Sequence, residues 1–77
     1  MGRIPRPTGC FLENEEYLGC PRGEKIWRSK DGTQLYTWDA LHGEVEVFNV
    51  RGRHLGVFHA TTKELVKPAV KGRRIDV

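Results

Sequence analysis

The 77-residue chain lacks long hydrophobic runs, and this shortage limits what it can be. No stretch approaches the ~20 apolar residues of a membrane-spanning helix. The first residues lack the basic, apolar and small-residue regions of a signal peptide. The sequence therefore predicts a soluble domain that reaches another compartment only as part of a larger protein or by another route. A chain this short buries only ~60% of its unfolded surface, so we expect one domain with a small core.

Cysteine is also scarce, because Cys10 and Cys20 are the only two in the chain. Their spacing fits no common zinc pattern, and no His-x-His motif or second cysteine pair completes four ligands. Neither has a neighbouring histidine or basic cluster that would mark a nucleophile. We therefore expect no metal and no cofactor. A disulfide and two free thiols both remain open.

The excess of positive charge is small, since 13 lysines and arginines stand against 10 acids, a net charge of +3. The distribution is less even. Residues 39–50 contain three acids and no base, whereas residues 63–77 contain five bases and two acids. Carboxylates beside basic flanks would suit a site that acts on an anion such as a phosphate. Ordinary solvated charge is the alternative, and the distribution alone favours it.

Short segments rich in β-branched and aromatic residues follow residue 25 and predict a mainly β fold, α+β at most. The expected architecture is one highly twisted antiparallel sheet with a short N-terminal helix over residues 11–18. Prolines break regular structure in residues 1–9, which should form a flexible arm or linker before a single domain over residues 10–77. The expected strands are residues 25–29, 34–39, 43–50 and 54–59, with weaker ones at 61–66 and 73–77.

Alternation within residues 43–50 sorts the side chains onto two faces. Val45 and Val47 point one way, towards the core. Glu44, Glu46 and Phe48 point the other way, onto a face that should be solvated.

The hairpin of residues 34–50 can bring Asp39, His42 and Glu46 together, because Asp39 ends one strand and His42 lies in the turn. A carboxylate and a histidine suit a ribonuclease, which takes a proton from the 2′-hydroxyl and gives one to the leaving 5′-oxygen. Each such group can contribute ~10²–10⁴-fold. A second carboxylate can orient the imidazolium, and an arginine can hold the phosphate, so this scheme requires no metal. The spacing alone fits a solvated hairpin with a surface histidine better.

A longer sequence pattern favours the ribonuclease site over the solvated hairpin. Residues 25–48 read KIWRSKDGTQLYTWDALHGEVEVF, and HLGVF follows at residues 54–58. The run resembles the cytotoxic ribonuclease domain of the colicins and cloacin that cleave small-subunit ribosomal RNA. The closest matches are LYTWDALHGEVE and RHLGVF. Similarity continues weakly through KELVK to GRRI and covers about two-thirds of the chain.

The resemblance implies that three residues are catalytic: Asp39, His42 and Glu46. Glu46 and His42 would share the work of base and acid, in an order left open, with the aspartate orienting the histidine. The arginine that assists at the phosphate aligns best with Arg73, because the matching Ile75 follows two residues later. Arg74 is the fallback.

The resemblance also implies supporting places near the cleft for Glu44 and His54. The basic side chains that could contact phosphates are Arg51, Arg53, Lys67, Lys71 and Arg74. Phe48 stands where the family has a tyrosine, so a hydroxyl contact is lost there. The aromatic residues Trp27, Tyr36 and Trp38 could stack on bases, but on strands we expect them to pack.

The implied function is that of a toxin. Members of the family are C-terminal domains of larger secreted proteins and act in the cytoplasm of a target bacterium. They cut RNA at the ribosomal decoding site, leaving a 2′,3′-cyclic phosphate and a 5′-hydroxyl, and so stop translation. Implied partners are the small ribosomal subunit and an immunity protein, expected to be acidic, with the chain a monomer or one half of that heterodimer. The alternatives are a non-enzymatic RNA- or protein-binding β-module and, less favoured, a metal-dependent nuclease.

Overall fold

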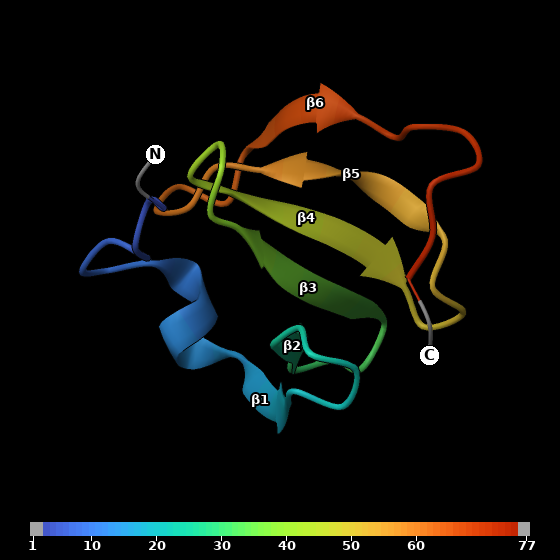
Figure 1. Ribbon diagram of the computed structural model, residues 1–77, viewed down its shortest axis with the longest axis horizontal. Coiled ribbons are helices and arrows are strands. Elements are labelled where there is room, and N and C mark those ends of the chain that lie inside the picture. Colours follow the sequence, from blue (N-terminus) through green and yellow to red (C-terminus); the bar gives the residue numbers. More distant parts are fainter. Residues whose placement is uncertain (1–2, 76–77) are drawn as a thin grey trace.

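The computed structural model describes residues 3–75 and shows one antiparallel sheet of six strands in chain order (Figure 1). The elements are η1 (Phe11–Asn14), β1 (Glu16–Gly19), β2 (Ile26–Arg28), β3 (Gln34–Asp39), β4 (Glu44–Asn49), β5 (His54–Phe58) and β6 (Leu65–Pro68). The prediction of a mainly β fold is confirmed. No helix within residues 3–75 is long and apolar enough to cross a membrane.

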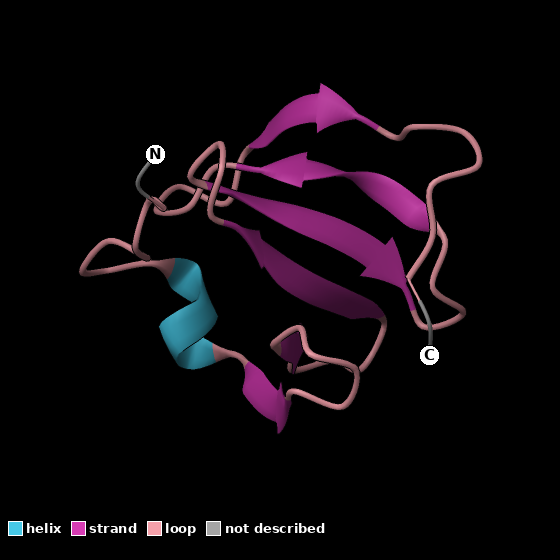
Figure 2. Ribbon diagram, viewed as in Figure 1, coloured by secondary structure: helices cyan, strands magenta, loops and turns pink. Residues whose placement is uncertain are grey.

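The helix expected over residues 11–18 is wrong beyond its first turn. A single 3-10 turn, η1, is followed at once by β1 (Figure 2). Only the first two residues of η1 are buried, so a longer helix would have no further apolar face to cover. Tyr17 instead packs across the β1–β2 pair on Trp27, with ring centroids 5.3 Å apart.

The main core lies between one face of the sheet and η1. Val45 and Val47 point into it as predicted, and Tyr36 beside them is fully buried. Trp27 is buried too, whereas Trp38 is only partly buried at the edge of this core. Both cysteines are free thiols, one buried in the core and the other exposed.

The opposite face is not solvated throughout, contrary to the expectation from alternation. Glu46 and Phe48 are buried there, with 4% and 2% of their surface exposed. A second small cluster covers this face, because Ile26, Leu35 and Phe48 pack together beneath Ile75. The C-terminal segment thus returns over a face that the strand pattern alone would leave open.

A β-bulge decides which β5 residues join this second face. Val47 pairs with Gly56, but the next residue, Phe48, pairs with His54, so Leu55 is left over. The bulge turns His54 onto the face of Phe48, whereas simple alternation would place it on the other face. Gly56 is needed beside the bulge, since a Cβ there would lie 2.6 Å from the side chain of Leu65 on β6.

The weaker strand expected at residues 61–66 forms later than predicted, as β6. A turn occupies the intervening residues, because the ring of His59 accepts the backbone N–H groups of Thr61 and Thr62 at 3.2 and 3.3 Å. The backbone N–H of His59 also donates to Glu64 at 2.8 Å and closes the turn.

The last strand expected, at residues 73–77, is reduced to one bridge between Arg53 and Arg74 in its described part, while residues 76–77 lie outside the described residues. Two backbone hydrogen bonds still fasten this segment beside the start of β5. The N–H of His54 donates to Arg73 at 3.1 Å, and the N–H of Ile75 donates to Gly52 at 2.9 Å.

Candidate active site

Three carboxylates meet on the second face of the β3–β4 pair. Asp39 pairs directly with Glu44, and Thr37 pairs directly with Glu46. Directly paired residues share a face, and their diagonal neighbours lie ~7–8 Å apart. Asp39 and Glu46 are such diagonal neighbours, so their side chains lie close together on this face.

Asp39 holds the turn that carries His42. Its Oδ1 accepts the backbone N–H groups of Leu41 and His42 at 3.0 and 3.2 Å, and its Oδ2 lies 2.7 Å from Nδ1 of His42. Burial acts to raise the pKa of Asp39, but the hydrogen bonds from His42 and Leu41 outweigh it and hold that pKa below its ordinary value. The ionised carboxylate orients the ring with Nδ1–H towards Asp39. Nε2 of His42 therefore points away from it, on a side chain that is 54% exposed.

Glu46 is held from two sides. Its Oε2 lies 2.8 Å from Nε2 of His54, and its Oε1 lies 2.5 Å from the guanidinium of Arg73. The His54 ring is completely buried, whereas the Arg73 side chain is half-exposed. One carboxylate oxygen is thus fixed in the interior, and the other meets a cation that solvent can reach.

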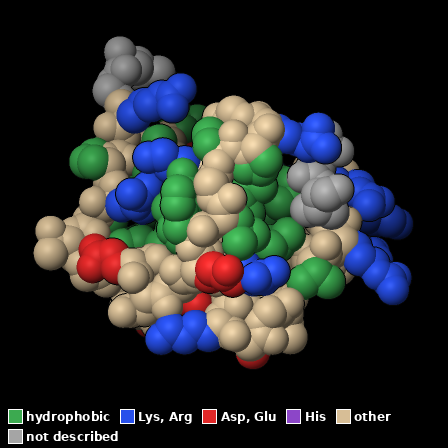
Figure 3. Space-filling view, turned by 90° about the horizontal axis from the view of Figure 1, so that it is seen from below, with side chains coloured by type: hydrophobic (Ala, Val, Ile, Leu, Met, Phe, Trp, Pro, Cys, Tyr) green, Lys and Arg blue, Asp and Glu red, His purple; other side chains and the backbone are tan. Residues whose placement is uncertain are grey.

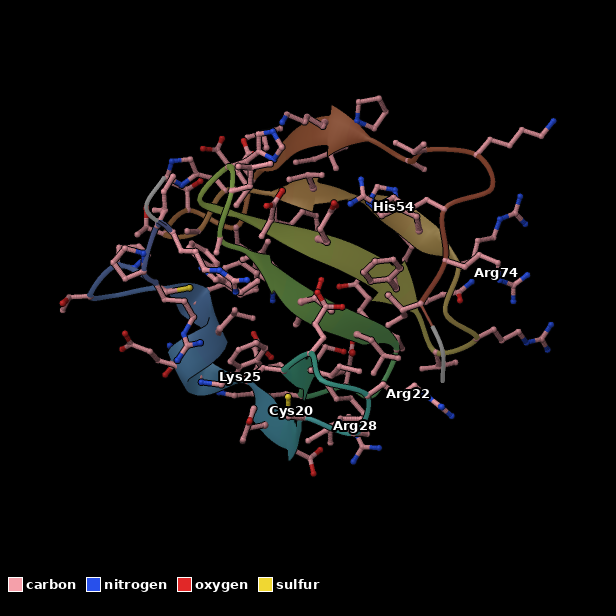
Figure 4. The ribbon with its side chains drawn as sticks, viewed as in Figure 1. Cys20, Arg22, Lys25, Arg28, His54 and Arg74 are labelled. Atoms are coloured by element: carbon pink, nitrogen blue, oxygen red, sulfur yellow. The ribbon has the colours of Figure 1, made fainter. Side chains whose placement is uncertain are left out.

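The tautomer of His54 follows from its second contact. The backbone N–H of Val70 donates to Nδ1 of His54 at 2.9 Å. A ring nitrogen that accepts a hydrogen bond carries no proton, so Nε2 carries it and donates to Glu46. Figure 4 shows His54 over β5, next to the C-terminal segment that supplies Val70. His54 therefore positions Glu46 and, being buried, does not reach a substrate.

A cleft of about 620 Å³ opens between the β3–β4 turn and the C-terminal segment. The four residues predicted to be catalytic all line it: Asp39, His42, Glu46 and Arg73. Phe48 and Arg74 line it as well. Residues from four separate parts of the chain therefore share one cavity, which is lined by a histidine, three carboxylates and three arginines.

Other predicted contacts lie elsewhere. Glu44 accepts a hydrogen bond from Lys67 of β6 at 2.8 Å. This bond raises the pKa of Lys67 above its ordinary value, with desolvation opposing it and the charge of Glu44 adding to it. The ammonium group of Lys67 is thus paired with the carboxylate of Glu44. Arg53 and Lys71 are exposed, and neither is among the described residues that line the cleft.

Two charged residues that line the cleft were not predicted, namely Arg3 and Glu24. Arg3 belongs to the N-terminal segment, and Glu24 precedes β2. No local motif marks either of them. Only folding brings these loops to the end of β3, so the sequence carries no spacing signal for them.

Comparison with known proteins identifies the family of the chain. The family model described as Cytotoxic matches residues 19–76. The matched range includes the four cleft residues predicted to be catalytic and leaves out Arg3. No curated protein matches the chain at a significant level. The chain belongs to the Cytotoxic family, the ribonuclease domain of the ribosomal-RNA-cleaving colicins and cloacin.

Proposed function

We propose that the chain is a metal-independent endoribonuclease toxin that cuts small-subunit ribosomal RNA at the decoding site. One observation carries this proposal: a single cleft holds an exposed, carboxylate-bound His42, the fixed carboxylate of Glu46 and the half-exposed Arg73. These residues supply an acid, a base and a phosphate-binding cation from the protein itself. The ribosomal substrate is supported by membership of the family.

Substrate binding begins at Arg73. In the free protein its guanidinium contacts Oε1 of Glu46. A scissile phosphate offers two non-bridging oxygens, which suit the bidentate fork of an arginine. When Arg73 turns to the phosphate, Oε1 becomes able to accept a proton, while Oε2 stays fixed by His54.

The bond changes then follow in one line. Oε1 of Glu46 takes the proton of the 2′-hydroxyl, and the 2′-oxygen bonds to phosphorus. The bond from phosphorus to the 5′-oxygen breaks, and that oxygen takes a proton from Nε2 of the His42 imidazolium, whose Nδ1–H stays with Asp39. Arg73 stabilises the negative charge that builds on the phosphoryl oxygens. The products are a 2′,3′-cyclic phosphate and a 5′-hydroxyl, and each proton transfer is expected to contribute ~10²–10⁴-fold.

The biological setting is inferred from the family. We propose that the domain is delivered as part of a larger secreted protein and acts in the cytoplasm of a target bacterium. A cognate immunity protein would keep it silent as a heterodimer. An acidic partner suits the Arg73 and Arg74 side chains at the cleft.

The test is to incubate the purified chain with intact bacterial ribosomes in magnesium buffer and, in parallel, with a short decoding-site RNA with and without EDTA. We expect one discrete fragment of small-subunit ribosomal RNA, whose 5′ end a kinase labels directly because it is a free hydroxyl. Folded protein that produces no fragment contradicts the enzyme proposal, and binding without cutting favours the β-module. Cutting that disappears in EDTA indicates a metal-dependent nuclease instead.

A further inference from the structure

The N-terminal segment, residues 3–8, docks against the turn that carries His42. The backbone N–H of Ile4 donates to Ala40, and the indole N–H of Trp38 donates to the backbone oxygen of Ile4, both at 2.8 Å. The Ile4 side chain covers Gly43, where an added Cβ would lie 3.1 Å from its Cγ2. Ile4 therefore holds the segment against this turn. These contacts with the turn do not involve the side chains of Arg3 and Arg6.

A second cleft, of about 840 Å³, runs along this segment. It adjoins the catalytic cleft, because the two cavities share four lining residues: Arg3, Glu24, Trp38 and Ala40. The space-filling view in Figure 3 shows Lys and Arg side chains on two sides of one face, with hydrophobic side chains exposed between them. Charged rims around apolar and aromatic surface are typical of grooves that bind single-stranded nucleic acid.

Basic side chains outnumber acidic ones along the second cleft. Arg3, Arg6 and Lys25 line it, against the two acids Glu13 and Glu24. The carboxylate of Glu13 already accepts the backbone N–H of Gly9 at 3.1 Å. Lys25 is exposed, and in Figure 4 it extends from the start of β2 towards η1.

Aromatic surface accompanies this charge. The guanidinium of Arg6 stacks over Trp27, 4.9 Å from the ring centroid, and so presents a flat cationic surface. Trp38 is partly exposed and lines both cavities, with its N–H turned to Ile4. Bases can stack on such surfaces whatever their identity.

We propose that this second cleft is an RNA subsite for the nucleotides on the 3′ side of the scissile phosphate. The proposal rests on the proposed ribonuclease function. The direction follows from the acid: His42 protonates the 5′-oxygen, which belongs to the 3′ nucleotide, and residues 3–8 lie against the His42 turn. Glu46 and Arg73 line the catalytic cleft but not the second cleft.

One side of the proposed subsite lies outside the family match. Residues 3–8 fall outside the matched range, which begins at residue 19, whereas Glu24, Lys25 and Trp38 on the other side fall inside it. The N-terminal segment would therefore add contacts to the substrate strand beside the residues proposed for the chemistry.

A ladder of short RNAs tests the proposal. Each carries one 2′-hydroxyl, with 2′-O-methyl groups elsewhere, so only one linkage can be cut. A minimal decoding-site sequence is lengthened by one, two or three nucleotides on either its 3′ or its 5′ side, and single-turnover kcat/KM is measured. We expect a gain of about tenfold for each stacked 3′ nucleotide, the order of base–aromatic stacking. The same 5′ extension should gain less than threefold.

Variants locate that gain. For each protein, the 3′ gain is the ratio of kcat/KM for the 3′-extended RNA to kcat/KM for the minimal RNA. This ratio should be at least fivefold smaller in the double variant Arg3→Ala/Arg6→Ala than in wild type. Each contact to a phosphate of single-stranded RNA contributes ~0.7 to the slope of the logarithm of the binding constant against the logarithm of salt concentration. The binding of the variant should therefore depend less steeply on salt. Lys30→Ala removes an exposed charge from the β2–β3 turn, outside both clefts, and should keep the full gain.

A binding measurement covers the case of a variant that does not fold. With fully 2′-O-methylated RNAs and the unaltered protein, the indole N–H resonance of Trp38 should shift further with each added 3′ nucleotide and not with added 5′ nucleotides. The His42 signal should shift with every RNA. A wild-type protein that cuts neither the ladder nor ribosomes contradicts the proposed function. A protein that cuts, yet gains nothing from 3′ nucleotides, gains more from 5′ nucleotides or keeps its gain in the double variant, contradicts the subsite alone.

Discussion

Two histidine–carboxylate pairs lie on the same face of the sheet, and they differ in burial rather than in chemistry. Nδ1 of His42 is 2.7 Å from Asp39, and Nε2 of His54 is 2.8 Å from Glu46. In the first pair the histidine is 54% exposed, whereas in the second its side chain is completely buried. The same two groups can therefore serve opposite purposes in one small domain.

The difference lies in which partner is held. In the exposed outer pair, Asp39 and His42, the carboxylate accepts two backbone N–H groups and orients the histidine ring, so that Nε2 of His42 stays accessible from the cleft. In the inner pair both ring nitrogens of His54 are occupied, by Val70 and by Glu46, so the histidine orients the carboxylate. In each pair, the residue proposed to exchange a proton with the substrate is the one that keeps an accessible atom. That residue is His42 in the outer pair and Glu46 in the inner pair.

The largest expected effect comes from removing the base. Glu46→Gln keeps the size of the side chain and an acceptor for His54, but it cannot take the 2′-hydroxyl proton. We expect the rate of ribosome cleavage to fall by ~10²–10⁴-fold. Glu44→Gln, two residues along the same strand and face, is the matched control and should stay within about threefold of wild type. A Glu46→Gln protein that retains a tenth of the activity would show that the base is another group.

Exchanging the two histidines for alanine should separate activity from stability. His42→Ala should lose ~10²–10⁴-fold in rate, yet change the free energy of unfolding by less than ~0.5 kcal/mol because the site is exposed. His54→Ala should cost ~2–4 kcal/mol in urea unfolding, since it leaves a cavity and unpaired groups on Glu46 and Val70. His54→Gln, which offers one donor and one acceptor, should recover part of that loss. Equal destabilisation by the two alanine variants would contradict the distinction between a catalytic His42 and a positioning His54.

The outer pair was accessible to sequence reasoning because it is local. Asp39 and His42 lie in one tight turn, so their spacing predicts contact, and strand alternation places Glu46 on the same face as Asp39. The choice of Glu46 over Glu44 came from resemblance to a family. The structure adds that only Glu46 reaches the cleft, while Glu44 is bound to Lys67.

The inner pair needed information that no local pattern contains. The position of His54 depends on the β4–β5 bulge, which reverses the face that alternation would assign. The contacts that fix Glu46 depend on Val70, which holds His54, and on Arg73, and both return from the far end of the chain. The short strand expected near that end also failed, because its backbone pairs with the start of β5 at one bridge only.

The two neighbouring arginines extend the comparison to the phosphate. Arg73 contacts Glu46, whereas Arg74 points outward in Figure 4, and its guanidinium lies 3.4 Å from the backbone oxygen of Arg51. We expect Arg73→Ala to reduce cleavage by ~10²-fold, the order found for removing one donor to a developing charge. Arg74→Ala should cost less than about threefold, as a contact at the rim. The reverse order would assign the phosphate to Arg74. Arg73→Lys should recover little, because an ammonium lacks the bidentate fork.

The smallest effect concerns the charge of Asp39, and pH exposes it. Since folding holds the pKa of Asp39 below its ordinary value of 3.8, its charge adds stability that is fully present above that value. The contribution is lost as the pH falls through the lower folded-state pKa, where the carboxyl is protonated in both states. Asp39→Asn keeps an acceptor for the backbone N–H groups of Leu41 and His42 but removes the charge. The variant should therefore melt at most a few degrees below wild type, by a margin that is fully present at pH 5 and shrinks below pH 4. Calorimetry on both proteins measures that margin. A margin that stays constant down to pH 2.5 would mean that Asp39 acts through the geometry of its turn, and a margin that widens in acid would reverse the sign assigned to its pKa.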